Sequence, residues 1–258
     1  ASVSPRMPGG RGWVLDSRFI DLWYGFYSDQ GEDLVLRGNT YQDCIAYGIA
    51  AHDRSRRLVI AGNEVFGTRL HHGIDLSSGV GDSWIVNNRS HHNQQSGIVL
   101  DHGSASNRLA FNETYKNQAD GIVLAESSHN LLWQNRSTSN ARHGIRVRDS
   151  EEIGLQDNLL AANGLSGIYG HAQALAGGRA RLSLRMVGDQ LVGNGASPIA
   201  VHAPSRLELY RLTLLAPPKA QGVALGGLLG ERQGEILDIL LRQQRAVRIE
   251  PVGSRAGE

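Results

Sequence analysis

The stretch YGIAAHDRS, residues 47–55, gathers side chains that can move protons. A histidine has an unperturbed pKa of about 6.5, so His52 can accept a proton at neutral pH and is our candidate general base. It lies beside Tyr47, Asp53 and Arg54 in the sequence. The alternative is an ordinary surface histidine, and the choice depends on which elements place these side chains and on which face.

The elements repeat along the chain. Glycine followed by Ile or Phe recurs every 23 to 25 residues, at Gly25, Gly48, Gly73, Gly97, Gly121, Gly144 and Gly167. Asparagine recurs in two further registers: Asn39, Asn63, Asn88, Asn112, Asn135 and Asn158, and then Asn93, Asn117, Asn140 and Asn163. Short alternating runs such as DGIVLAE separate these markers and are typical of strands. A fixed period of this length predicts a solenoid, here a parallel β-helix.

We therefore expect an all-β, right-handed parallel β-helix of about nine coils over residues 1–228, with an inserted loop at 172–181. Residues 229–258 should form a C-terminal cap helix and tail, because the apolar spacing over 229–245 suits an amphipathic helix. No comparable cap precedes Trp13, so we expect the natural protein to extend further at its N-terminus. The asparagine registers should form stacked ladders, which makes the sequons at Asn88, Asn112 and Asn135 structural.

The glycine register also predicts which residues face outward. In a strand, residues one and three after the glycine should point inward, and residues two and four should point outward. The outward columns and the position before the glycine bring histidines, acids, arginines and tyrosines to one face, long enough for a polymer. Our candidates for substrate binding on or beside this face are Arg54, Arg69, His72, Asp101, Asp120, His143, Arg146, Arg148, Tyr169 and His171. The alternative is that these charges only pair with one another.

Composition limits the other possibilities. The formal net charge is +1, which supplies no bulk field for nucleic acid or an anionic membrane. No apolar run approaches the length of a membrane span. Cys44 is the single cysteine, so no intrachain disulfide can form. The histidines are too spread along the axis to meet at one metal ion, with His52, His72 and Asp75 as the one exception. We expect no metal and no cofactor.

Long segments of the chain resemble the periplasmic mannuronan C5-epimerases of bacterial alginate biosynthesis. The segments that carry this resemblance are DLWYGFY, RGNTYQD, YGI…HDRS, NNRS…SGIVLD, DGIVLAES…NLLW, RHGIRVR, NGLSGIYGH, LELYRL, LAPPK and LGERQGEILD. The resemblance implies a right-handed β-helix enzyme that acts on polymannuronate in the periplasm, with other periplasmic alginate-export proteins as candidate partners.

Two departures from the family pattern fall in the expected site. The family motif Asp-Pro-His-Asp corresponds to Ala50, Ala51, His52 and Asp53 here. The family also has an arginine, held to neutralise the substrate carboxylate, where this chain has Ser78. The resemblance implies that His52 is the proton acceptor, with Asp53 or a neighbouring coil orienting its ring. Arg54 or Arg69 would replace the missing arginine, and water or Tyr47 would return the proton.

Asp75 stands in the same outward column as Ala50, one coil away at about 4.8 Å. We predict that Asp75 supplies the carboxylate missing at position 50. Three functions follow from this pattern: a C5-epimerase, a non-catalytic polyuronate-binding or scaffold protein that has lost part of the site, and a lyase. Elimination by a lyase begins with the same proton abstraction and differs in the departure of the 4-O leaving group.

Overall fold

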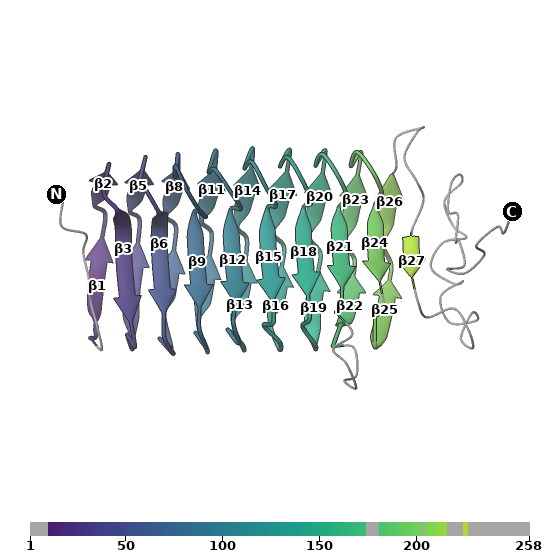
Figure 1. Cartoon of the computed structure of the whole chain (residues 1–258), viewed down its shortest axis with the longest axis horizontal. Helices are drawn as coiled ribbons and strands as arrows, with labels where there is room; N and C mark the ends of the chain where they lie inside the picture. Colours follow the sequence, from purple (N-terminus) through teal and green to yellow (C-terminus); the bar gives the residue numbers. More distant parts are fainter. Residues whose placement is uncertain (1–9, 174–180, 203, 216–223, 227–258) are drawn as a thin grey trace, which may run out of the picture.

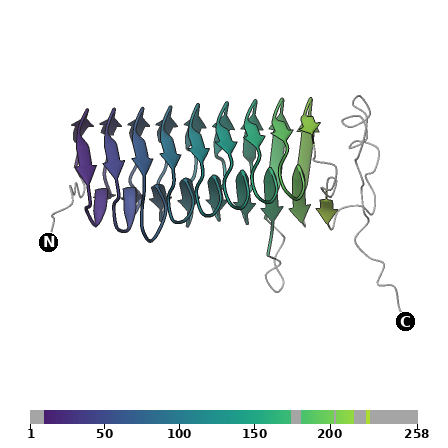
Figure 2. The ribbon, with the colours of Figure 1, turned by 90° about the horizontal axis from the view of Figure 1, so that it is seen from above.

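The computed structural model describes residues 10–173, 181–202, 204–215 and 224–226. This part of the chain is an all-β solenoid of three parallel nine-stranded sheets, and it contains no helix (Figures 1 and 2). Each coil contributes one strand to each sheet, so the expected fold class and about nine coils are confirmed. The cap helix expected over 229–245 and the boundary at 228 lie outside the described residues, as does most of the insertion expected at 172–181.

The three sheets are named A, B and C. Sheet A contains β3 (Tyr24–Asp29), β6 (Tyr47–His52), β9 (Ile74–Ser77), β12 (Ile98–Asp101), β15 (Ile122–Ala125), β18 (Ile145–Arg148), β21 (Ile168–His171), β24 (Ile199–His202) and β27 (Ala224–Gly226). Sheet B contains β1 (Gly12–Leu15), β4 (Leu34–Arg37), β7 (Val59–Ala61), β10 (Trp84–Val86), β13 (Arg108–Ala110), β16 (Leu131–Trp133), β19 (Ile153–Gln156), β22 (Ser183–Val187) and β25 (Arg206–Tyr210). Sheet C contains β2 (Arg18–Ile20), β5 (Thr40–Gln42), β8 (Glu64–Phe66), β11 (Arg89–His91), β14 (Glu113–Tyr115), β17 (Arg136–Thr138), β20 (Leu159–Ala161), β23 (Gln190–Val192) and β26 (Thr213–Leu215).

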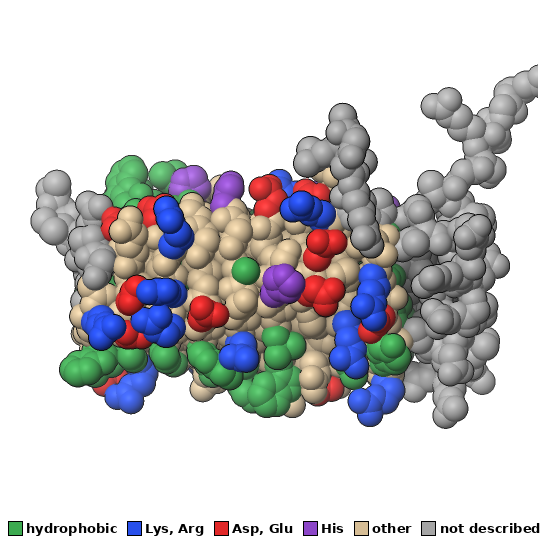
Figure 3. Space-filling view, turned by 90° about the horizontal axis from the view of Figure 1, so that it is seen from below, with side chains coloured by type: hydrophobic (Ala, Val, Ile, Leu, Met, Phe, Trp, Pro, Cys, Tyr) green, Lys and Arg blue, Asp and Glu red, His purple; other side chains and the backbone are tan. Residues whose placement is uncertain are grey.

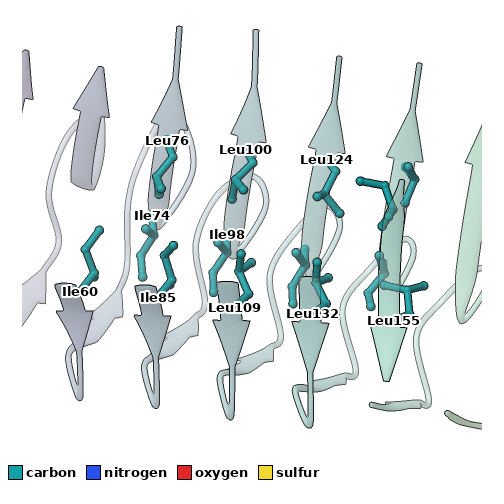
Figure 4. Close-up of a cluster of buried hydrophobic side chains, with 14 of the residues drawn as sticks. Ile60, Ile74, Leu76, Ile85, Ile98, Leu100, Leu109, Leu124, Leu132 and Leu155 are labelled. Carbon is teal, nitrogen blue, oxygen red and sulfur yellow. The ribbon is translucent and has the colours of Figure 1, made fainter. Parts of the chain in front are cut away.

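The core is a continuous stack of inward side chains from all three sheets. Ile74 and Leu76 of one coil lie against Ile98 and Leu100 of the next, and all four are fully buried (Figure 4). These are the positions one and three after the glycine, so the inward register is confirmed. Stacking is needed because a single coil cannot enclose its own apolar side chains.

Glycine and asparagine hold the corners of each coil. A Cβ atom at Gly121 would lie 1.8 Å from Ser137 Oγ, so only glycine fits there. The Asn112 Nδ2 donates to Asn135 Oδ1 at 2.9 Å, and the Asn112 Oδ1 accepts from the Asn88 amide N at 3.0 Å. The sequon asparagines Asn88, Asn112 and Asn135 are at most 1% exposed, which confirms their structural role.

Candidate active site on the outer face of sheet A

The strand register brings the predicted outward columns together on sheet A. Ala50 pairs with Asp75, and Asp75 pairs with Val99 in the next coil. The column prediction is therefore confirmed. The outward Asp75, Val99, Val123 and Ala125 are nonetheless at most 9% exposed. The middle of this face is thus recessed between its neighbours, which strand alternation alone does not predict.

His52 and Asp75 form the central pair of this face. The His52 Nε2 and Asp75 Oδ2 atoms lie 3.0 Å apart, with the side chains 23% and 4% exposed. Because a carboxylate accepts the hydrogen bond, Nε2 carries a proton and Nδ1 is the atom left to accept one. Burial acts to lower the pKa of His52, but the hydrogen bond and charge of Asp75, helped by Asp53 and Asp101, raise it overall.

Aromatic side chains surround this pair. The ring centroid of Tyr27 lies 5.4 Å from that of His52, and Tyr47 lies 6.3 Å away, both edge-on. Tyr47 also stacks on Tyr24 and on His71, at 6.0 and 5.1 Å. Burial, with the nearby carboxylates of Asp75 and Asp101, raises the pKa of Tyr47 to about 12. The Tyr47 hydroxyl therefore keeps its proton at neutral pH and can donate it.

His72 is a neutral hydrogen-bond donor beside the pair. The Ser96 amide N–H donates to His72 Nδ1 at 3.1 Å, so the imidazole proton of neutral His72 sits on Nε2. Burial lowers the pKa of His72, although Asp75 acts in the opposite direction. This residue therefore offers an N–H group without a positive charge.

The residues that follow β6 lie in a turn. Asp53 and Arg54 are exposed and have positive φ, 52° and 64°, so strand alternation ends at His52. The structure orients His52 through Asp75, and among the described residues the Asp53 carboxylate makes no hydrogen bond to the imidazole. The Arg54 amide donates to the Ser78 carbonyl at 2.8 Å, and a Cβ at Gly79 would lie 3.2 Å from Arg54 Cγ.

Arg69 is separate from the His52 pair. Its guanidinium contacts the Asp21 carboxylate at 2.6 Å, and both residues lie in turns between sheets C and A. The expectation that Arg69 is as near a substitute as Arg54 for the missing arginine is weakened by this ion pair.

A second polar cluster lies three coils further along the face. The fully buried Asp120 contacts Arg146, with 3.7 Å between Oδ2 and NH1, and accepts from the His143 amide at 3.0 Å. The His143 ring stacks on Tyr169 at 4.5 Å, and Tyr169 lies against His171. Among the described residues, the buried Arg146 Nε and His171 Nδ1 have no hydrogen-bond partner. Buried polar atoms without a partner are uncommon in native proteins, and an ordered water or an ion is one of the explanations for them.

The remaining predicted side chains pair locally. Arg148 contacts Glu126 at 2.7 Å, and Asp101 contacts the His102 imidazole at 3.0 Å. The sequence interpretation missed one contributor, His71, which stacks on Tyr47 from the adjacent turn. The doublet His71-His72 immediately before a register glycine was a signal that could have indicated it.

Within the described residues, no three metal-binding side chains come close enough to hold an ion. The same part of the chain has no helix long and apolar enough to cross a membrane.

The fold and this face define the class of protein. Residues 24–205 match the family described as "Right handed beta helix region", and the chain belongs to that family. It is 54% identical over 260 residues to the mannuronan C5-epimerase of Pseudomonas aeruginosa, covering 97% of this chain and 48% of the relative. The mannuronan C5-epimerase AlgG of Azotobacter vinelandii is 52% identical over 256 residues, covering 96% of this chain and 49% of the relative.

A solved structure supports the same relationship. The periplasmic alginate epimerase AlgG superposes with a TM-score of 0.77 at 48% identity, covering 82% of this chain and 51% of that chain. The chain spans about half the length of the curated relatives it matches.

Proposed function

We propose that the outer face of sheet A is the active site of a mannuronan C5-epimerase, with His52 as the base. The observation that carries the proposal is the His52–Asp75 pair, set in a recessed polar face of a chain about half identical to named mannuronan C5-epimerases. The substrate is polymannuronate, and the product contains guluronate. The related structure is that of a periplasmic epimerase, and we place the action of this chain in the periplasm as well.

The reaction exchanges one proton at C5. His52 Nδ1 removes the C5 proton, and the electron pair left at C5 delocalises into the adjacent carboxylate. A donor on the opposite side of the ring then returns a proton to C5, which inverts the centre with no net change in composition. The C5 proton is weakly acidic, so the carboxylate must be stabilised while negative charge develops on it.

Asp75 provides the carboxylate that orients the base. In the family pattern an aspartate stands at position 50, whereas here Ala50 pairs with Asp75 in the next coil of the same column. A carboxylate at either position of this column can reach an imidazole on the neighbouring column. The carboxylate that partners His52 thus lies one coil further along the solenoid axis than in the family pattern.

Arg54 is the residue we assign to the substrate carboxylate. Its backbone is bonded to Ser78, the position of the family's arginine, and its side chain begins beside Gly79. The Arg54 guanidinium can therefore reach the space that the side chain of an arginine at position 78 would occupy. The neutral N–H of His72 is a further donor for the same carboxylate.

Tyr47 is the residue we assign as the acid. Its pKa of about 12 keeps the hydroxyl protonated, and its ring lies edge-on to His52. The uronate polymer then continues along the face to the Arg146 cluster, where the partly exposed Arg146 guanidinium can pair with another carboxylate of the substrate.

The test is incubation of polymannuronate with this chain in deuterated water, followed by NMR of the polymer. We expect guluronate signals with deuterium at C5, and neither in His52→Ala. Deuterium without inversion would mean an intact base and a failed acid, so Tyr47 would be reassigned. No exchange would favour a binding protein, and ultraviolet absorbance from an unsaturated product would reveal a lyase.

A further inference from the structure

The outer face of sheet B carries an unusual concentration of exposed aromatic side chains. Seven of the thirteen exposed large hydrophobic residues in the described part of the chain lie on strands of this sheet. Trp84 and Trp133 are 42% and 37% exposed. Arg108 of β13 pairs with Trp84 on one side and with Leu131 on the other, and Leu131 shares β16 with Trp133. In Figure 3 hydrophobic side chains gather along one edge of the molecule. An exposed apolar patch of this kind on a folded protein marks a binding surface.

Arginine predominates among the charged side chains on the strands of sheet B, with Glu208 as the exception. Arg37, Arg108 and Arg185 project from β4, β13 and β22, which are successively three coils apart, or about 14 Å. The Arg108 guanidinium lies 4.9 Å above the Trp84 ring. Neither Arg37 nor Arg108 has a carboxylate partner among the described residues, whereas Arg185 contacts Glu208 at 3.5 Å.

We propose that this tryptophan face, the outward residues of sheet B around Trp84, Arg108, Leu131 and Trp133, is a second binding surface for a linear anionic polysaccharide. Flat indole rings suit the apolar faces of sugar rings, and guanidinium groups suit uronate carboxylates. A repeating rigid surface along the solenoid axis matches a repeating extended polymer. The identity of the polymer as a polyuronate rests on the proposed function; the location of the surface does not.

Such a surface gives the enzyme a second binding site for the same polymeric substrate. Sheets A and B are joined directly by the turn after β6, so a polymer bound at one face raises the effective concentration of the same polymer at the other. The tryptophan face should therefore affect long substrates and leave short oligomers unaffected.

The experiment measures polymannuronate binding in the His52→Ala background, where turnover is absent. Trp84→Ala/Arg108→Ala should weaken binding by about tenfold. The matched control is Phe66→Ala/Arg89→Ala, which removes one aromatic side chain and one arginine from the outer face of sheet C and should bind as the parent does. Arg108→Glu is a second variant that leaves Trp84 in place, and it should weaken binding as well.

Two comparisons complete the test. In the chain with His52 intact, Trp84→Ala/Arg108→Ala should raise KM for long polymannuronate and leave KM for short oligomannuronates unchanged. Equal affinity in the double variant and its control overturns the proposal, as does equally tight binding of uncharged mannan. Weaker binding by the double variant supports the binding surface on sheet B even if no epimerisation is detected. The proposed surface and the proposed epimerase function can therefore be refuted independently of each other.

Discussion

The imidazole of His52 and the carboxylate of Asp75 meet across two neighbouring coils, with 3.0 Å between Nε2 and Oδ2. The two residues come from different outward columns, four and two residues after their register glycines. The hydrogen bond that orients the base therefore depends on the stacking of coils, because its partner belongs to the next coil.

Replacing the carboxylate should change both the rate and its pH dependence. His52 must be neutral to accept a proton, and its pKa is raised by Asp75, so the wild-type rate should rise with pH through a value above 6.5. Asp75→Asn removes the charge that favours imidazolium and leaves the burial that opposes it. We expect kcat to fall by about 10²- to 10³-fold and the acid limb to move to lower pH. Steady-state rates from pH 5 to 9 check both effects.

The control for this prediction is Asp53→Asn. Its carboxylate is exposed in the turn and lies outside the hydrogen bond to the imidazole, so the change in kcat should be small. An unchanged pH profile in Asp75→Asn would contradict the assigned role of Asp75.

The column relationship predicts a rescue. Asp75→Ala should lose most activity, and adding Ala50→Asp should recover at least about tenfold, because position 50 lies opposite position 75 in the same column. Ala50→Asp alone should be harmful, since it places two carboxylates one coil apart at positions that are almost fully buried. The measurement is the initial epimerisation rate by NMR. If Asp75→Ala/Ala50→Asp were no more active than Asp75→Ala, the inference that a carboxylate at position 50 can replace the one at position 75 would be refuted.

Much of the fold and one part of the site could be predicted from the sequence, for a definite physical reason. A glycine corner sets the phase of each strand, and alternation then determines which side of the sheet each residue occupies. This logic placed Asp75 next to Ala50 correctly. It stops where a strand ends, and the positive φ of Asp53 and Arg54 turns both side chains away from the predicted alternation.

Other features depend on neighbours that a repeat pattern does not describe. The burial of Val99 on an outward column reflects the side chains on either side of it. The proton position on His72 depends on one amide, Ser96 N–H, in the next coil. The stack of Phe66, His91 and Tyr115 on sheet C likewise appears only when three coils are aligned.

The asparagine ladder should be a major source of stability. Asn112 is fully buried, and Asn112→Ala would leave the Asn88 amide and the Ile85 carbonyl without their partners. We expect the free energy of unfolding to fall by about 2–4 kcal/mol, measured from urea denaturation. Gln118→Ala, at an exposed position in the following turn, should change it by less than about 0.5 kcal/mol. Equal effects of the two substitutions would contradict a stabilising ladder.

His143 should make the fold sensitive to acid. Burial, aided by Arg142 and Arg146 against the opposing charge of Asp120, lowers the pKa of His143 to about 4. An unfolded chain binds this proton near pH 6.5 and the folded chain only near pH 4. Stability is therefore lost as pH falls through this window, by on the order of 3 kcal/mol.

His143→Gln should remove most of this dependence, because the glutamine side chain cannot take up the proton. Urea midpoints at pH 4.5 and 7 measure the difference. His102 is the matched control, since its hydrogen bond to Asp101 raises its pKa and its contribution has the opposite sign, present below pH 6.5 and lost at higher pH. His102→Gln should therefore retain the acid sensitivity of the parent chain. If His143→Gln retains it too, the buried imidazole is not its source.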